Sequence, residues 1–436
     1  MNQILKNIIN KRFFRKVKSK LKLKIRNGAI LHNEIAKKYH LVKYKHSHPK
    51  LRQVHDAITI ELPRIFCLIN DHPNTIKFLN DVDEILTTKE PKNLVFNHRN
   101  TQYIELAASF LFDTRIKKYC QKWRNRQIKI GLSGLFSLER DVNNFLVSFG
   151  LLDELQVKDK FHPYSVDPDY KSKYLTFKFR GSEKRAYEKG NASVQLADYF
   201  QKCFRHNKFT IQEEAKNNIS NAVSEIIGNA EEHSGLKNTE WNVLGFYDKT
   251  NSVCSFAILN RGLSIYESLS DRSSTSKEVI SKIEKVVNSN LSIMERTKKL
   301  TSKATSECIW NVMALQDGIS SKRPDKGKGS SRGQGLLTVL HFIDVIRAQD
   351  DVTQIAVISG HSKILIDYKY PITSTLVNGQ KFRQIIFNKE NDLYKPQDAN
   401  KVILMEDDFK GTIITGRFVI NKKYLKERLA KKSNEI

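Results

Sequence analysis

The chain has 436 residues, of which 39% are hydrophobic and 28% charged, and its Lys and Arg residues outnumber its Asp and Glu residues to give a formal net charge of +27. This is the composition of a globular protein long enough for two or three domains. No apolar run approaches ~18–20 residues, the N-terminus lacks a signal-peptide core and the five cysteines are scattered, so we expect a cytoplasmic protein without a transmembrane helix or a disulfide framework.

Residues 1–50 form a basic N-terminal arm. They carry fifteen Lys and Arg residues against one acidic residue, Glu34, and contribute +14 of the net charge, which excludes a uniformly basic, histone-like chain. Within residues 1–26 the apolar side chains approximate a helical stripe with a basic opposite face. Three interpretations stay open: a helix packed on the body with a solvated basic face, a helix on an anionic membrane surface, and an arm that contacts nucleic acid.

Residues 51–165 are predicted to form a small α/β domain, because segments rich in Ile, Leu and Phe alternate with segments of helical periodicity. The expected strands cover residues 57–70, 94–96 and 127–132, and the expected helices cover residues 75–86, 103–123 and 137–149.

Residues 166–190 are polar and are expected to link this domain to a second one, with one strand at residues 174–179. The second domain spans residues 191–422, and a basic C-terminal tail follows at residues 423–436. The fold class expected for the whole is α/β, with an α+β two-layer sandwich as the larger domain. Its expected helical segments are residues 194–205, 211–232, 276–316 and 335–342, and its expected strands are residues 242–247, 253–259, 354–359, 364–368 and 411–420.

One helix of the second domain carries an unusual polar stripe. At 100° per residue, Glu225, Asn229 and Glu232 fall on one narrow stripe beside the apolar face of residues 219–230, with His233 at its edge. A carboxylate and a carboxamide in this arrangement can hold a hydrated Mg²⁺, and the carboxylate can orient or deprotonate a nucleophile. The alternative for these residues alone is an ordinary solvated face of the helix.

Two glycine-containing turns follow. The strand at residues 253–259 runs into Asn260-Arg261-Gly262-Leu263-Ser264-Ile265, where a turn lets backbone approach a flat ligand. Further on, Ser331-Arg332-Gly333-Gln334-Gly335-Leu336 opens a helix, so that its backbone N–H groups can face a phosphate. The low-complexity segment at residues 320–331 adds several cations to the second turn.

In this order the elements resemble the GHKL (Bergerat-fold) ATP-binding domain of histidine kinases and DNA gyrase, and most closely that of bacterial anti-sigma serine kinases. Residues 225–233 match the E-x-x-x-N-A-x-x-H box, residues 260–265 stand where the family has D-x-G-x-G-I, and residues 331–336 match the R-G-x-G-L box. Residues 409–412 resemble the closing F-x-G-T strand, and residues 320–331 stand at the ATP lid.

The resemblance implies ATP and Mg²⁺ as cofactors and assigns a role to each matching residue. Asn229 is the Mg²⁺ ligand and Glu225 the general base, or the residue that orients the attacking group. Asn260 reads the adenine amino group, Gly262 leaves room for the ring, and Thr412 supports the base. The other residues assigned to the nucleotide site are His233, Ser264, Arg332, Gly333, Gly335 and Leu336, with the two glycines cradling the phosphates.

The sequence departs from the family at Asn260 and Ser264, where the family has Asp and Gly. A carboxamide still accepts one hydrogen bond from the adenine amino group, but charge-assisted bonds are roughly twice as strong, so altered recognition of the base is expected.

The first domain resembles the STAS domain of anti-sigma-factor antagonists over roughly residues 57–155, with a degenerate motif. The phosphoacceptor serine of that family falls near Leu106 or Ala107, which have no hydroxyl, and Ser109 is out of register.

These resemblances imply a regulatory protein in which ATP and Mg²⁺ order the basic lid and control the binding of a protein partner, with slow ATPase or serine-kinase activity as an option and homodimerisation as another. The alternatives are a GHKL ATPase that uses residues 1–50 on nucleic acid, and a non-catalytic pseudo-ATPase that serves as an interaction module.

Overall fold

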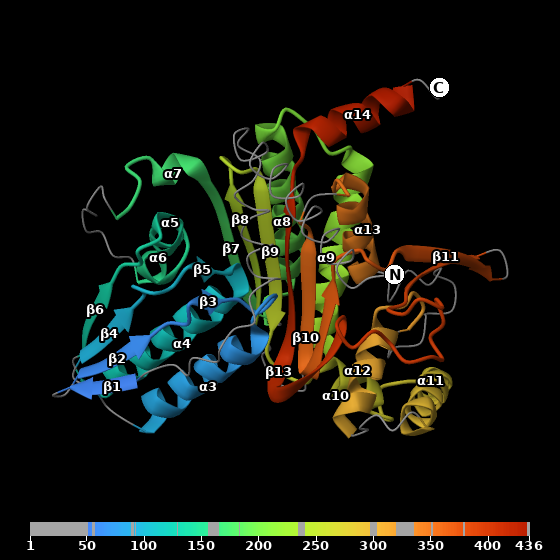
Figure 1. Cartoon of the computed structure of the whole chain (residues 1–436), viewed down its shortest axis with the longest axis horizontal. Helices are drawn as coiled ribbons and strands as arrows, with labels where there is room; N and C mark the ends of the chain where they lie inside the picture. The colour runs from blue at the N-terminus through green and yellow to red at the C-terminus, as the bar shows by residue number, and fades with distance from the viewer. Residues whose placement is uncertain are drawn as a thin grey trace, which may run out of the picture.

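The computed structural model shows a mixed α/β protein with parallel and antiparallel sheets (Figure 1). Within the described part of the chain, no helix is both long enough and apolar enough to span a membrane. The basic arm at residues 1–50 lies outside the described residues. Those that the structure describes are 51–54, 57–88, 91, 93–128, 130–155, 165–182, 184–233, 240–296, 303–319, 335–349, 352–377 and 380–433.

The N-terminal part consists of β1 (Leu51–Val54), β2 (Ala57–Glu61), β3 (Ile65–Phe66), α3 (His72–Thr88), β4 (Asn93–Asn97), β5 (Tyr103–Ile104), α4 (Leu106–Asn125), β6 (Gly131–Leu135), α5 (Arg140–Ser148) and α6 (Leu151–Glu154). Its main sheet has the order β1-β2-β4-β6, with β1 antiparallel to β2 and the other neighbours parallel. In β2 and β4 every second residue is buried, which is the pattern of strands with one face on a core.

The expected boundaries in this part shift for local reasons. The single strand expected at residues 57–70 is divided into β2 and β3, and Pro63, which cannot donate to a ladder, lies between them. The helix expected from residue 103 begins at Leu106, because the Glu105 carboxylate accepts hydrogen bonds from the backbone N–H groups of Ala107 and Ala108 and so caps it.

The C-terminal part consists of α7 (Tyr170–Lys173), β7 (Tyr174–Ser182), α8 (Ala186–His206), α9 (Glu213–His233), β8 (Glu240–Asp248), β9 (Val253–Asn260), α10 (Ile265–Ser270), α11 (Lys277–Arg296), α12 (Lys303–Ala314), α13 (Gly335–Ile346), β10 (Gln354–Ile366), β11 (Ile372–Val377), β12 (Gln380–Ile385), β13 (Val402–Val419) and α14 (Lys422–Ser433). Its five-stranded sheet has the order β10-β13-β9-β8-β7 and every neighbouring pair is antiparallel. β11 and β12 form a separate hairpin.

Three long helices cover one face of this sheet. α9 packs between α8 and α13, and their apolar faces share a core with Phe256 and Ile258 of β9 (Figure 1). Ile219, Ala222 and Val223 of α9 are buried there as the helical period predicts, and Ile227 is buried in place of Ile226, which is only partly buried.

The N-terminal part covers the other face of the sheet (Figure 1). Ala257 and Leu259 alternate with Phe256 and Ile258 along β9 and point to the core that α3 and α4 share with the sheet. α4 contacts β8, β9 and β13 directly. The sheet therefore has apolar cover on both sides, which explains why residues 256–259 are apolar without alternation.

Buried polar contacts fix the two parts against each other. The Glu105 carboxylate, besides capping α4, accepts a 2.5 Å hydrogen bond from the Thr415 hydroxyl of β13. The Lys363 ammonium of β10 donates to the carbonyl oxygen of Ile69 at 2.6 Å and lies 3.1 Å from Nδ1 of His72. Desolvation is the main reason that the pKa of Lys363 is lowered to about 8 and that of His72 to about 3.

The structure differs from three of the expected segments. Residues 166–190, expected to be a linker, include all of β7, which pairs with β8 along nine residues, and the first turns of α8. The tail expected at residues 423–436 is helical from Lys422 to Ser433. The expected strands at residues 354–359 and 364–368 join into the single strand β10, with a register shift at Gly360.

Candidate functional site

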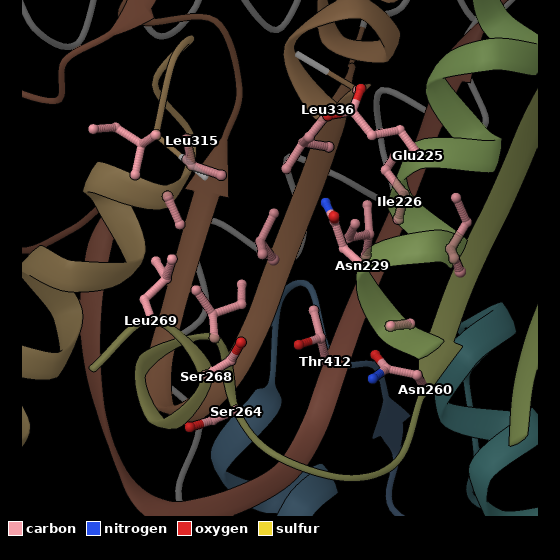
Figure 2. A pocket seen from close by; sticks show the side chains of 18 of the residues that line it. Glu225, Ile226, Asn229, Asn260, Ser264, Ser268, Leu269, Leu315, Leu336 and Thr412 are labelled. Atoms are coloured by element: carbon pink, nitrogen blue, oxygen red, sulfur yellow. The ribbon is translucent and has the colours of Figure 1, made fainter. Parts of the chain in front are cut away.

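A pocket of about 160 Å³ lies between the sheet and the ends of α9, α10, α12 and α13 (Figure 2). Its floor is formed by residues of β9, β10 and β13, and its walls are mostly Leu and Ile side chains. A mainly apolar pocket with a few convergent polar groups is the usual form of a small-molecule site. The polar side chains that line it belong to Glu225, Asn229, Asn260, Ser264, Ser268 and Thr412.

α9 presents the carboxylate and the carboxamide to the pocket. Ala222, Val223 and Ile227 anchor the buried side of the helix, so Glu225 is only partly buried and Asn229 is exposed. The two residues are four apart, about one helical turn, and Figure 2 shows both beside the same cavity. Two residues of the polar stripe predicted from the sequence therefore face a pocket, whereas Glu232 does not line it. Among the described lining residues, Glu225 is the only ionisable one.

Asn260 and Thr412 lie side by side on the floor. They are paired residues of the neighbouring strands β9 and β13, and the side chain of Asn260 is almost completely buried. The hydroxyl of Thr412 lies 3.0 Å from the hydroxyl of Ser359. Ser359 also donates to the carbonyl oxygen of Gly411 at 2.8 Å and accepts the backbone N–H of Ile265 at 2.8 Å. Ser359 thus ties the floor of the pocket to the start of α10.

Gly335 brings the start of α13 into contact with α9. A Cβ atom at this position would lie 2.7 Å from the carbonyl oxygen of Ala222 and 3.2 Å from Oε2 of Glu225. Only a residue without a side chain allows this approach. Leu336, the next residue, lines the pocket beside Glu225 (Figure 2).

The turn after β9 differs in part from the sequence-based expectation. Gly262 has a φ of 142°, in the range that favours glycine, but it lines a second cavity and not this pocket, so its expected place beside a ring is wrong. Ser264 does line the pocket and is also the N-cap of α10, in a capping box with Glu267. Burial raises the pKa of Glu267, but the hydrogen bonds with Ser264 and the neighbouring Lys410 ammonium together lower that pKa below its ordinary value.

Some predicted site residues lie outside the described part of the chain. These are Arg332, Gly333 and the whole basic segment at residues 320–331. His233 is the last residue of α9, but its side chain is not among those described. The structure therefore brings together Glu225, Asn229, Asn260, Ser264, Gly335, Leu336 and Thr412, from chain segments far apart in the sequence.

Several lining residues were not predicted. Ser268 and Leu269 of α10 and Leu315 and Ile319 after α12 close the pocket on the side away from α9 (Figure 2). They lie in the long segment between two motifs, where the sequence shows helical periodicity but nothing that points to a ligand. Gly411 does not line the pocket, but it stands directly before Thr412 in the motif, and its φ of 113° together with the carbonyl oxygen of Asn260 beside it leaves no room for a Cβ atom.

Comparisons with protein-family models, with curated proteins and with solved structures found no match to this chain.

Proposed function

We propose that the chain is a regulatory ATP-binding protein of the GHKL type, with a Bergerat-fold C-terminal part and a STAS-like N-terminal part. The observation that supports this proposal is that seven residues named from sequence motifs line one pocket between a sheet and its helices. An antiparallel sheet with three long helices on one face agrees with the expected nucleotide-binding architecture.

The pocket residues fit an adenine ring. The walls contributed by Ile226, Leu269 and Leu315 are apolar and suit the faces of a flat heterocycle. On the floor the buried carboxamide of Asn260 can accept a hydrogen bond from the exocyclic amino group. Thr412 keeps its hydroxyl oriented through Ser359, so it can hold a second ring atom or a bridging water.

The mouth of the pocket fits Mg²⁺ and phosphates. Mg²⁺ prefers one or two protein oxygens together with phosphate oxygens and water, and the Asn229 carboxamide with the neighbouring Glu225 carboxylate offers that donor set. Bound there, the cation would neutralise phosphate charge. Because Gly335 has no side chain, the start of α13 packs directly against α9 beside Glu225, and the first N–H groups of α13 lie at the same place. Glu225 is then positioned to orient a nucleophile.

Ligand binding at this pocket would act on the segment at residues 320–334, which joins α12 to α13 and carries several Lys and Arg residues. The described lining residues contain no cation, and this segment, which directly precedes the lining residue Gly335 in the sequence, carries positive charges suited to a triphosphate. Contacts made only in the nucleotide-bound state would shift the segment to one conformation and change a protein-binding surface.

The N-terminal part does not offer a serine to the site. Leu106 and Ala107 are buried, and Ser109, the nearest hydroxyl, is also buried and donates a 3.0 Å hydrogen bond to Asp113. A serine-kinase activity would therefore act on a partner and not on this helix.

The test is calorimetry with ATP, with and without Mg²⁺, on the full chain. We expect saturable binding to the wild type, loss of the Mg²⁺-dependent part in Asn229→Ala, and intact binding without turnover in Glu225→Ala. Asn221→Ala and Glu214→Ala change exposed residues of the same helix and serve as matched controls. Absence of ATP binding by the wild type would refute the proposal and favour a non-catalytic interaction module. Equal turnover by Glu225→Ala would remove its role as the base.

A further inference from the structure

A second cavity, of about 610 Å³, lies where the N-terminal part meets the turn after β9. α3 and α4 line one side of the cavity, and the turn at residues 261–263 lines a second side. Residues 408–410 of β13 line a third side. None of the residues in the proposed ATP and Mg²⁺ roles lines it except Gly262. The apolar residues on its walls are Leu68, Ile76, Leu79, Leu111, Leu263 and Phe409.

The charged residues around this cavity are paired, with one exception. The Arg115 guanidinium holds the Asp83 carboxylate at 2.6 Å. The Lys410 ammonium lies 2.6 Å from Asp408 and 3.6 Å from Glu267, whose other oxygen accepts the backbone N–H of Ser264. Each of the three carboxylates that line the cavity therefore already has a cationic partner.

Arg261 is the exception. Within the described residues, its guanidinium makes no hydrogen bond or ion pair, although it lines the cavity. Although the residue is exposed at the rim, neighbouring protein atoms partly desolvate the guanidinium, which is the main cause that lowers its pKa; the like charge of Arg115 lowers it further, while Asp83 and Glu240 act in the opposite direction. A guanidinium that is always charged and has a neighbouring cation is stabilised by an anion with oxygens in its plane.

We propose that this cavity binds a small amphiphilic anion, a carboxylate or a phosphate monoester on an apolar body, whose head pairs with the guanidinium of Arg261. The apolar body lies against the Leu, Ile and Phe side chains of the wall, and the head stays at the rim, where Arg261 is exposed to solvent. Arg261 supplies five fixed N–H donors, which match carboxylate and phosphate oxygens alike.

The position of this site gives it a route to the pocket. Leu263 lines both cavities, and Asn260 directly precedes Arg261. A ligand held by Arg261 would restrain the turn that carries Asn260, so it would change the affinity for ATP, a consequence that rests on the proposed function. Binding of the anion itself does not depend on ATP.

The test is calorimetry of the full chain, without nucleotide, with octanoate, octyl phosphate and the neutral control octanol. We expect at least one of the two anions to bind with a Kd at least ten-fold lower than that of octanol, and the tighter one identifies the head group. Arg261→Ala should abolish this difference and Arg261→Lys should retain part of it. Arg272→Ala, which changes an exposed arginine of another surface, should behave as the wild type.

Three outcomes would overturn the site: no binding of either anion, octanol binding as tightly as the anions, or unchanged anion binding by Arg261→Ala. The effect on the pocket is read in a second titration, of ATP at saturating anion, where we expect at least a three-fold change in Kd. An unchanged Kd for ATP would refute the coupling alone. Because the first titration contains no nucleotide, its result stands whether or not ATP binds.

Discussion

The replacement Gly335→Ala tests how closely α13 must approach α9. The new methyl group would lie 2.7 Å from the carbonyl oxygen of Ala222, and ordinary contact begins at 3.4 Å. The start of α13 must therefore move by about 0.7 Å, because the obstructing atom belongs to the backbone of a packed helix. Oε2 of Glu225, at 3.2 Å, would have to give way as well.

The expected cost follows from two opposing contributions. Overpacking of a tight contact costs about 1–3 kcal/mol, and the replacement of glycine by alanine in a helix returns up to about 1 kcal/mol. With the full gain of about 1 kcal/mol subtracted, we expect Gly335→Ala to lower the free energy of unfolding by about 0–2 kcal/mol. If the pocket binds ATP as proposed, displacement of the N–H groups of α13 should also weaken ATP roughly ten-fold, or about 1.4 kcal/mol.

The assay is equilibrium unfolding in urea, with Gly190→Ala as the matched control. Gly190 lies in α8, and a Cβ atom built there meets no other atom within 4 Å. That replacement should stabilise the protein by about 0.5–1 kcal/mol, because only the conformational freedom of glycine is lost. If Gly335→Ala stabilised the protein as much as Gly190→Ala does, the close packing of α13 on α9 would be wrong.

Three further predictions follow from other contacts. The replacement Asn260→Asp should lower the Kd for ATP about five-fold in calorimetry, because the carboxylate makes a charge-assisted bond to the adenine amino group. The same buried carboxylate should lower the urea midpoint of the free protein. Weaker ATP binding by this variant would contradict the role given to Asn260. The pKa of Lys363 is about 8 in the folded protein and 10.5 ordinarily, so between these pH values the unfolded chain binds more protons than the folded one. The free energy of unfolding should therefore rise by about 1.4 kcal/mol per pH unit between about pH 8 and pH 10.5. Urea midpoints of Lys363→Met should lack this rise, and an equal rise in both proteins would refute the assignment. Glu105→Ala leaves two N–H groups of α4 uncapped and removes the acceptor of the Thr415 hydroxyl. It should therefore lower the free energy of unfolding in urea by about 2–4 kcal/mol, whereas Thr415→Val should lower it by about 1 kcal/mol. Similar costs for the two variants would argue against the double role of Glu105.

Much of the secondary structure could be predicted because its causes are local. The helices α3 and α9 and the strands β4, β8 and β9 follow from the spacing of apolar residues over at least one full repeat. The strand β7 was underestimated, because only one residue of its nine is fully buried and its alternation is weak. The hairpin of β11 and β12 gave no clear signal, since most of its residues are polar and only Ile385 is buried among those whose burial is described.

The candidate site was predictable for a different reason. Glu225 and Asn229 share a helix, so their common direction follows from the helical period alone. The meeting of Asn260 with Thr412 depends on the register of β9 and β13, which the sequence indicated only through a family motif. The contacts made by Ser359, and those between Glu105 and Thr415, join residues that local sequence cannot relate.

The apolar cover on both faces of the five-stranded sheet has a consequence for how such a chain can evolve. Ala257, Leu259 and Ile413 would meet water if the N-terminal part were lost, and a sheet face of that kind makes a protein prone to aggregate. Recombination that cut the gene between the two parts would therefore yield products that fail in the cell. We therefore expect selection to keep the two parts in one chain, since neither face of the sheet is suited to water.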